Sequence, residues 1–437
     1  MDELPPLARA SKLHHSSTVW KKLAIVLLTL VVTIGFVLLI AQDQEVLLLE
    51  SAYPASDQEF TSYAAALTGT AVTRGNRFHM LVNGDKIFPR MLEAVRGARE
   101  RISLETYIYK DGQVAAQFDE ALEGAARRGV TVNIVFDALG SPNAEENHGE
   151  RLRAAGARIG IFNEPAWYSL ESVNYRTHRK ILVVDGRIGF TGGVGMSDDW
   201  IGSIEEGKRW RDTQFEMVGP AVRYLEGGFA ENLVEASEEH ITPELGRPLP
   251  EPGATDQTIV VWSSPTGGGN ALKLLYLLSI AGARSTIDIA SPYFLLDEST
   301  ESALTRAVDR GVRVRVLVEG EVTDAKPVKY SSRAAYERLM ESGIEFYEYQ
   351  PTMMHAKTMV VDNAWSMFGS ANFDNRSLEL NDELNVATDD RGLAADITRQ
   401  FEIDLSSAAK LELESWRRRP TLDKVREWMW SHFSEVF

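Results

Sequence analysis

The stretch His178-Arg179-Lys180-Ile181-Leu182-Val183-Val184-Asp185 decides the fold, because the chain contains its pattern twice. The second copy is His355-Ala356-Lys357-Thr358-Met359-Val360-Val361-Asp362. Gly192-Gly193 follows the first aspartate, and Gly369-Ser370 follows the second at the same distance. A single His-x-Lys is typical of a surface strand beside a solvated lysine. Two copies with matched aspartates and glycines indicate a paired functional site.

The repeat extends on the N-terminal side of each motif. Residues 98–109 alternate like a strand, residues 113–128 follow a helical pattern, and residues 132–136 form a second strand pattern. The same patterns recur over 283–294, 299–310 and 314–318. This order predicts an α/β fold of two similar domains related by pseudo-two-fold symmetry, each with a mostly buried β-sheet flanked by helices.

The predicted domain boundaries follow from these repeats and from changes in composition. They are 1–22 for an N-terminal segment, 23–41 for a transmembrane helix, 42–75 for a stalk and lead-in helix, 76–240 for the first domain, 241–257 for a Pro-rich linker and 258–437 for the second domain. The second domain ends in a short amphipathic helix from residue 422 onward. We expect its apolar side to pack on the domain, with contact to a lipid interface as the alternative.

The segment 23–41 is apolar and uncharged, and its nineteen residues nearly reach the ~20 that span a bilayer. A cleaved signal peptide and a buried helix are the alternatives, although a signal core usually has only about 7–15 residues. Basic residues precede the segment and acidic residues follow it. This asymmetry predicts an N-terminus in the cytoplasm and a large domain on the outer side.

Composition narrows the classes of function. The chain has 437 residues, a net charge of −17 and no cysteine. It therefore has no disulfide, thiolate metal site or cysteine nucleophile. The acidic balance disfavours a nucleic acid partner, because neutralisation of phosphates by basic residues drives that affinity.

The paired motifs resemble the His-Lys-Asp motifs of the phospholipase D superfamily over about residues 75–410. The flanks Asn174–Lys180, Trp210–Thr213 and Asn372–Ser377, with Leu380-Asn381, are similar to those of bacterial cardiolipin synthases. The resemblance implies a single-pass bacterial inner-membrane enzyme with its catalytic domain on the periplasmic side. It also implies phospholipid substrates: two phosphatidylglycerol molecules that yield cardiolipin.

Two imidazoles and two ammonium groups around one phosphate suit a two-step displacement without a metal or cofactor. The catalytic candidates are His178, Lys180, Asp185, His355, Lys357 and Asp362. The near symmetry of the motifs leaves the attacking histidine open, and the resemblance assigns His178 as nucleophile and His355 as acid and base. Each aspartate stands an odd number of residues after its histidine. We therefore expect Asp185 and Asp362 to anchor strand ends rather than orient imidazoles.

The resemblance supplies the remaining site residues. Asp212 and Glu383 match positions of carboxylates that orient catalytic histidines. The predicted phosphate-binding residues are Gly192, Gly193, Gly369, Ser370, Asn372 and Ser377. Gly195 stands where the pattern has asparagine, so the first half either lacks one phosphate contact or makes it through a backbone amide or a water molecule.

Aromatic residues near the motifs are candidates for a lipid channel. Tyr107, Tyr293 and Phe294 end equivalent strands, and core packing is the alternative for them. Trp167, Tyr168 and Leu170 precede the first motif as a possible apolar rim for acyl chains. Arg376 is interpreted as structural.

Three other functions use the same residues. A hydrolytic phospholipase D forms the same phosphatidyl-histidine intermediate and transfers its phosphatidyl group to water. A phosphodiesterase or nuclease is disfavoured by the acidic charge and the predicted anchor. A non-catalytic lipid-binding protein is disfavoured because both His-Lys pairs are intact.

Overall fold

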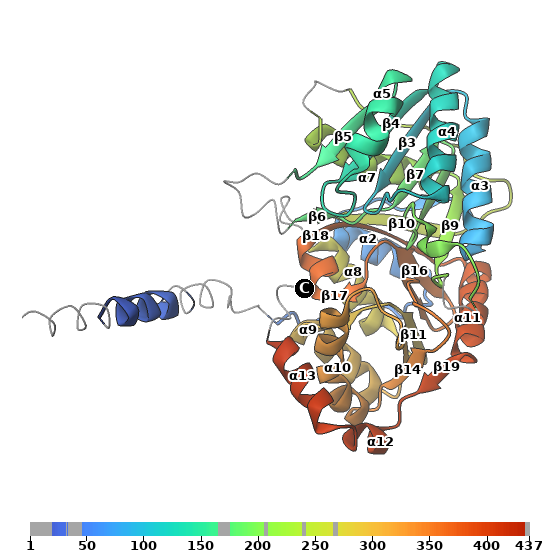
Figure 1. Ribbon diagram of the computed structural model, residues 1–437. Helices are drawn as coiled ribbons and strands as arrows, with labels where there is room; N and C mark the ends of the chain where they lie inside the picture. Colours follow the sequence, from blue (N-terminus) through green and yellow to red (C-terminus); the bar gives the residue numbers. More distant parts are fainter. Residues whose placement is uncertain are drawn as a thin grey trace, which may run out of the picture. The chain divides into compact units, whose positions relative to one another are not determined.

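The computed structural model describes residues 20–31, 33, 46–164, 175–204, 209–237, 242–264 and 270–432 (Figure 1). The chain divides into two compact units, Met1–Leu47 and Leu48–Phe437. In the first unit, residues 20–31 are helical. Within the described residues, no helix has both the length and the apolar character needed to span a membrane. The predicted span 23–41 lies partly outside them, and the predicted rim Trp167, Tyr168 and Leu170 lies wholly outside.

The second unit contains two similar halves, and the first is built on a seven-stranded sheet. Its order is β2 (Arg77–Val82), β9 (Thr213–Val218), β8 (Ile188–Gly192), β7 (Ile181–Val184), β3 (Arg101–Thr106), β4 (Thr131–Asp137) and β5 (Arg158–Phe162). The strands β3, β4 and β5 are parallel, and the other pairs are antiparallel. The helices of this half are α3 (Gly84–Gly97), α4 (Gln113–Arg127), α5 (Glu150–Ala154) and α7 (Val222–Glu235), with short turns η1 (Glu145–Gly149) and η2 (Asp198–Trp200).

The second half repeats this strand order in a ten-stranded sheet. Nine strands follow one path: β1 (Thr73–Arg74), β10 (Gln257–Ser263), β18 (Asn381–Thr388), β16 (Trp365–Gly369), β15 (Thr358–Val361), β11 (Thr286–Ala290), β13 (Arg313–Glu319), β14 (Glu345–Tyr349) and β19 (Ala408–Lys410). The tenth strand, β6 (Arg176–Thr177), pairs with β18 off this path. Its helices are α2 (Phe60–Thr68), α8 (Ala271–Gly282), α9 (Glu298–Asp309), α10 (Lys326–Glu341), α11 (Arg391–Leu405), α12 (Leu413–Arg417) and α13 (Thr421–Ser431). A small sheet pairs β12 (Phe294–Leu295) with β17 (Phe373–Asp374), and η4 (Arg376–Leu380) precedes β18. The predicted α/β duplication is confirmed.

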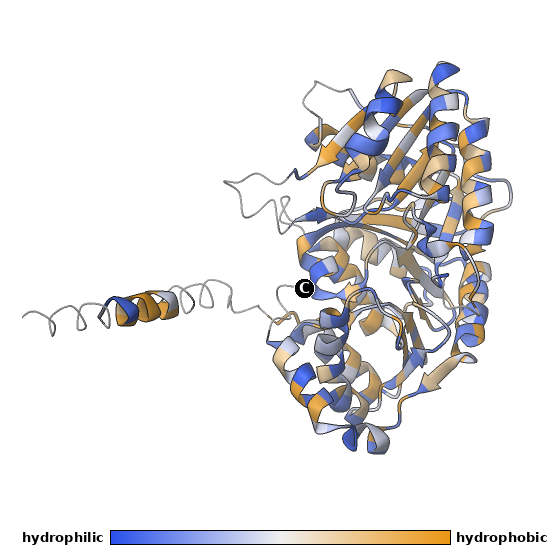
Figure 2. Ribbon diagram, in the orientation of Figure 1, coloured by the Kyte–Doolittle hydropathy of each residue, from blue (hydrophilic) through white to orange (hydrophobic). Residues whose placement is uncertain are grey.

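The strands after the His-x-Lys motifs, β7 and β15, lie inside their sheets. All four residues of β7 are buried: Leu182 and Val184 face the core with α3 and α4, and Ile181 and Val183 face the core with α7. A strand covered on both faces needs a continuous apolar run, which is the pattern of this motif (Figure 2). The motif histidines are therefore attached to rigid elements.

The two halves share a hydrophobic core. It is formed by α7 and α11 together with strands of both sheets. Phe215 of β9 stacks on Phe368 of β16, with ring centroids 3.9 Å apart. Strand β6 (Arg176–Thr177), which leads into the first motif, pairs with β18 of the other half. These contacts fix the two motifs relative to each other.

The residues predicted as stalk and lead-in contribute to the second half. Helix α2 lies within the predicted stalk and lead-in, and its Phe60, Ala64 and Ala65 lie in the core of the second half. The Phe60 and Trp365 rings meet edge to face at 5.1 Å. Strand β1 pairs with β10. The apolar spacing of α2 explains why this segment packs instead of extending away.

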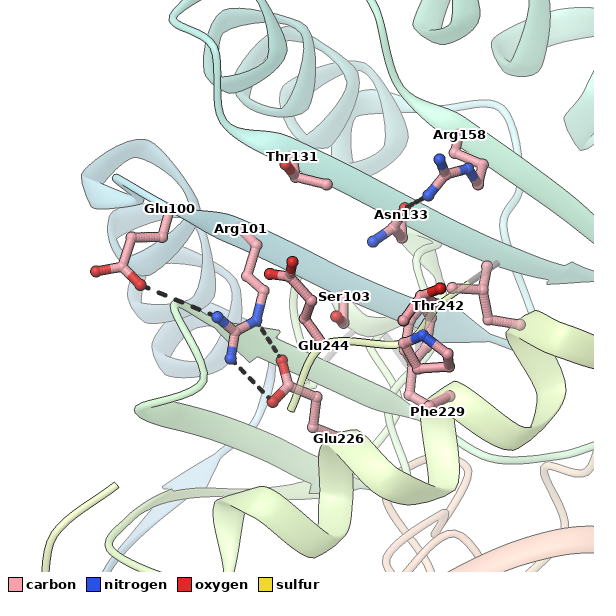
Figure 3. A pocket seen from close by; sticks show the side chains of 13 residues that line it. Glu100, Arg101, Ser103, Thr131, Asn133, Arg158, Glu226, Phe229, Thr242 and Glu244 are labelled. Atoms are coloured by element: carbon pink, nitrogen blue, oxygen red, sulfur yellow. Dashed lines mark hydrogen bonds and ion pairs between the residues drawn. The ribbon is translucent and has the colours of Figure 1, made fainter. Parts of the chain in front are cut away.

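The linker docks along the first half. The backbone amide of Gly246 donates to the carboxylate of Glu226 in α7, which also accepts from the guanidinium of Arg101 at 2.7 and 3.1 Å. Figure 3 shows this pair in a polar pocket beneath Thr242 and Glu244. Attachment at these points fixes the path of the linker between the halves.

The C-terminal helix packs on the domain, but the expectation that it does so through its apolar side is wrong. Helix α13 packs against α10, but its buried residue is Glu427, with 1% of its surface exposed. The apolar residues Leu422, Val425, Trp428 and Met429 are exposed. The carboxylate of Glu427 pairs with Arg333 and Arg419, so an ion-pair network takes the place of apolar packing.

Candidate active site

The two motifs are tied to opposite halves through their backbones. His178 and Lys180 lie just before β7, and the amide of His178 donates to the carbonyl of Asp382 in β18 at 2.9 Å. His355 and Lys357 lie just before β15, and the amide of His355 donates to the carbonyl of Arg211 at 2.8 Å. Each histidine is therefore held next to the segment that carries a buried carboxylate of the other half.

The side chains repeat this crossed arrangement. Nδ1 of His178 lies 2.7 Å from Oε1 of Glu383, and Nδ1 of His355 lies 2.8 Å from Oδ2 of Asp212. Both carboxylates are fully buried. Each half thus supplies one imidazole and the carboxylate that orients the other imidazole. Neither dyad exists within a single half.

The charge states follow from this pairing. Burial alone would raise the pKa of Asp212 and Glu383, but the neighbouring histidines and lysines outweigh it and hold both below their usual range. Burial also lowers the pKa of His178 to about 4 and lowers that of His355. An ionised carboxylate only accepts, so each neutral ring donates from Nδ1 and keeps a lone pair on Nε2. Nε2 is therefore the ring atom with the chemical capacity to act as nucleophile or base.

The lysines complete a compact cationic site. Each ammonium donates to the backbone carbonyl of its own motif histidine at 2.8 Å. Nζ of Lys357 also lies 3.2 Å from both ring nitrogens of His355. Burial, together with the charge of Lys357, lowers the pKa of Lys180 to about 7. A phosphodiester anion at this site would relieve the repulsion between the two ammonium groups.

We expect these shifts to set the pH dependence of the free enzyme. The kcat/KM should rise as pH increases through about 4, because His178 loses its proton, and should fall above about pH 7, because Lys180 loses its charge. A pH–rate profile in mixed micelles measures both limbs. Lys180→Arg keeps the charge and should move the alkaline limb upward. An alkaline limb that stays in place in this variant would refute the assignment to Lys180.

The two dyads have different surroundings. Asp212 accepts from the indole N–H of Trp200 at 2.8 Å and from the amide of Thr213 at 2.7 Å. The His355 ring contacts both Trp200 and Trp210, at 5.5 and 5.2 Å between ring centroids, and the two indoles also contact each other at 4.8 Å. The sequence did not predict Trp200 as a hydrogen-bond donor to Asp212. The only sign of this role in the sequence is that Trp200 and Trp210 both lie close to Asp212 along the chain.

The dyad of His178 and Glu383 has a serine and a tyrosine beside it in place of the two tryptophans. Glu383 accepts from the hydroxyl of Ser370, and the ring of Tyr107 meets the His178 ring edge to face at 5.1 Å. Tyr107 therefore borders the site, as the channel prediction requires. The hydroxyl of Tyr293 donates to Asp324 at 2.5 Å. Phe294 is fully buried and stacks on Phe373, so core packing replaces its predicted channel role.

The predicted phosphate role of the glycine pairs needs correction. The amides of Gly193 and Ser370 donate to the carbonyls of Thr213 and Leu384, so strand pairing already uses them. A Cβ on Gly193 would lie 2.2 Å from Oδ1 of Asp212. Glycine is required there to admit the carboxylate, and Ser370 at the matching position donates to Glu383 instead. Gly192 and Gly369 also take part in strand pairing, with β9 and β18 respectively.

The loop after the second glycine motif retains a phosphate candidate. Asn372 is buried, and its side-chain NH2 is the group that can donate to a phosphoryl oxygen. The Ser377 hydroxyl accepts from the Asn372 amide at 3.2 Å, so it shapes this loop. In the first half, a Cβ on Gly195 would lie 2.8 Å from Cβ of Ile108. The close approach of Ile108 explains why asparagine is not found there.

Asp185 and Asp362 lie at the far ends of β7 and β15 from the histidines. Asp185 accepts from the amides of Arg99, Glu100 and Arg101 at 2.7 to 3.1 Å, and Asp362 accepts in the same way from 284–286. Both have φ 53°, a left-handed turn conformation that aspartate tolerates. These two motif residues act as backbone anchors and do not contact the imidazoles.

We therefore expect Asp185→Ala to affect stability more than chemistry. Loss of the carboxylate leaves three amides without their acceptor and should lower the free energy of unfolding by about 1–3 kcal/mol. Denaturant unfolding measures this loss, and the kcat of the folded fraction should stay within a few-fold of the parent. A large fall in kcat with unchanged stability would return Asp185 to the catalytic group.

One buried ion pair was not predicted. Arg211 is 2% exposed, and its guanidinium binds Asp404 of α11 through two bonds of 2.8 and 2.6 Å. It also donates to the carbonyl of Asp212 and the hydroxyl of Thr213. Arg211 thus holds the segment of Asp212 against the second half. Among the described residues, no group of three or more histidines, aspartates and glutamates has a metal-binding arrangement.

Comparisons with known proteins agree with this geometry. A family model described as cardiolipin synthase, phospholipase D-like domain, matches residues 91–206 and 276–405. A cardiolipin synthase A of Pseudomonas aeruginosa is 35% identical over 354 residues, which cover 80% of this chain and 71% of that protein. A cardiolipin synthase A of Pseudomonas fluorescens is 32% identical over 351 residues, covering 80% and 73%.

A solved structure shows the same fold at low identity. Phosphatidylserine synthase from Haemophilus influenzae superposes with a TM-score of 0.62 at 13% identity, covering 86% of this chain and 100% of that chain. The family match spans both halves and includes both His-x-Lys motifs. The chain is therefore an enzyme of the phospholipase D superfamily and belongs to the family of cardiolipin synthase phospholipase D-like domains.

Proposed function

We propose that the protein is a membrane-anchored phosphatidyltransferase that makes cardiolipin and glycerol from two molecules of phosphatidylglycerol. The crossed dyads are the observation that carries the proposal, because they give two imidazoles, one from each half, with Nε2 available. Membership of the cardiolipin synthase family supports the choice of substrate. The predicted segment 23–41 would anchor the chain in the inner membrane, with the catalytic unit on the periplasmic side.

In the first step, Nε2 of His178 attacks phosphorus of the donor lipid. The N–P bond forms as the P–O bond to the headgroup glycerol breaks. His355 is neutral in the free enzyme, takes up a proton when the phosphodiester anion binds beside it, and gives that proton to the departing oxygen. The strongly lowered pKa of His178 supports its role as nucleophile, because the ring stays neutral at working pH. Lys180 and Lys357 stabilise negative charge on the phosphoryl oxygens.

In the second step, neutral His355 takes the proton from a primary hydroxyl of the second phosphatidylglycerol. The acceptor oxygen bonds to phosphorus and the N–P bond breaks, which restores the starting protonation of both histidines. Glu383 and Asp212 keep both rings in the required tautomer and orientation. Water as acceptor would give phosphatidic acid by the same sequence.

Product analysis separates the candidate functions. Purified full chain in mixed micelles is given phosphatidylglycerol labelled in its acyl chains, and the products are resolved by thin-layer chromatography. We expect labelled cardiolipin with release of glycerol, unaffected by a chelator. Phosphatidic acid as the main product would establish hydrolysis. Cleavage of an oligonucleotide with inert lipid would overturn both lipid functions.

A further inference from the structure

Helix α13 presents an apolar face that the second half does not cover. Leu422, Val425, Trp428 and Met429 are 60, 53, 65 and 45% exposed. Their spacing of three and four residues places them along one side of the helix. Figure 1 shows α13 at the edge of the second half, with α10 on its inner side. Among the described residues, this helix therefore has a polar inner side and an apolar outer side.

The orientation of α13 is fixed by its inner side. The Glu427 carboxylate bonds to Arg419 at 2.8 Å and pairs with Arg333 of α10 at 3.3 Å. Both guanidiniums also lie over the ring of Trp416, at 4.6 and 4.5 Å. The hydroxyl of Ser331 donates to the carbonyl of Trp430. Rotation of the helix to bury its apolar side would break this network.

The segment also differs in charge from the rest of the chain. Residues 416–432 contain five basic and two acidic residues, although the whole chain carries −17. Arg417, Arg418 and Arg426 are exposed beside the apolar face. Each contacts an acidic side chain, so the local field is moderate. The positive excess lies in the arginines that precede α13, because the helix itself has two basic and two acidic residues. A basic segment next to a helix with one apolar face that includes tryptophan is typical of proteins that bind an anionic membrane surface.

We propose that α13 lies in the interfacial layer of a bilayer that contains anionic phospholipid, with its apolar face toward the acyl chains. This inference rests on the proposed function, because the proposed donor lipid is anionic and the predicted anchor holds the chain at a membrane. In Figure 1, α13 and β6, the strand that leads into His178, both lie on the left side of the molecule. Docking through α13 would turn that side toward the membrane.

The absence of cysteine from the chain allows a site-specific test. Met429→Cys in the full chain is labelled with an environment-sensitive fluorophore and reconstituted into vesicles of phosphatidylglycerol and phosphatidylethanolamine. Ile403→Cys is the matched control, because Ile403 is an apolar residue of α11 with 55% exposure. We expect acyl-brominated lipids to quench the label at position 429 by at least about twofold and to leave the label at 403 unchanged. Equal, water-like emission at both positions would overturn the proposal.

A second measurement separates docking from catalysis. The variant Leu422→Ser/Val425→Ser/Met429→Ser keeps Glu427 and its ion pairs. We expect its KM for phosphatidylglycerol in vesicles to rise about tenfold or more, with turnover in mixed micelles unchanged. An unchanged KM in vesicles would overturn the role of α13 and leave the proposed reaction standing. If the protein self-associates without lipid and this shields the label at position 429 from water, the apolar face of α13 is an interface with a second copy of the chain, and the proposal is overturned.

Discussion

We expect His178→Ala to reduce turnover by at least about 10⁴-fold, because the variant lacks the atom that would attack phosphorus. The remaining imidazole belongs to the other half, and Asp212 holds its Nδ1. It cannot occupy the position of His178 without breaking that bond. Steady-state cardiolipin formation in mixed micelles measures the loss.

The partner substitution, His355→Ala, should have a different signature. A phosphatidyl donor with a p-nitrophenol leaving group needs no general acid, so the first step should proceed and release about one equivalent of p-nitrophenolate. The second step should then stall, because no base activates the acceptor. His178→Ala should give no burst.

The histidine variants need a matched control. His79 has a side chain that is 69% exposed, and His79→Ala should behave like the parent enzyme. A burst in His178→Ala with none in His355→Ala would reverse the assignment of the two roles. Retention of substantial turnover in both variants would remove the histidines from the chemistry altogether.

The second large effect should come from the crossed carboxylates. We expect Glu383→Gln to lower kcat by about 10³- to 10⁴-fold, because the amide no longer enforces the Nδ1–H tautomer of His178. Asp212→Asn should cause a similar loss through His355. Each substitution should therefore alter the tautomer of the histidine that belongs to the opposite half.

Nuclear magnetic resonance of ring nitrogens can identify which histidine responds. In Glu383→Gln the Nδ1–H signal of His178 should shift strongly while that of His355 stays near its parent position, and Asp212→Asn should give the reverse. Near-ultraviolet circular dichroism checks that the fold is retained. A response of the histidine in the same half would contradict the crossed dyads.

Much of the fold was predictable because the chain carries each signal twice. The apolar runs 181–184 and 358–361 each follow a His-x-Lys motif, and this recurrence indicated a duplication. The odd offset of Asp185 predicted its distance from the imidazole. In each of these cases the information lies in local periodicity.

The pairing of the dyads could not be predicted in the same way. Glu383 and Asp212 were identified by family resemblance, but their assignment to the opposite histidine depends on the β6–β18 pairing across the halves. The steric need for Gly193 depends on the buried position of Asp212. The outward apolar face of α13 depends on ion pairs with Arg333 and Arg419, which helical periodicity does not reveal. These features arise from tertiary contacts between distant segments.

In the proposed reaction, one histidine carries the phosphatidyl group while the other transfers protons. Mass-spectrometric mapping of His355→Ala, quenched in base after one turnover with the p-nitrophenol donor, tests it most directly, because a phosphoramidate is acid-labile. We predict one phosphatidyl adduct on the peptide that contains His178 and no adduct in His178→Ala. An adduct on another residue, or none despite release of p-nitrophenolate, would contradict the account.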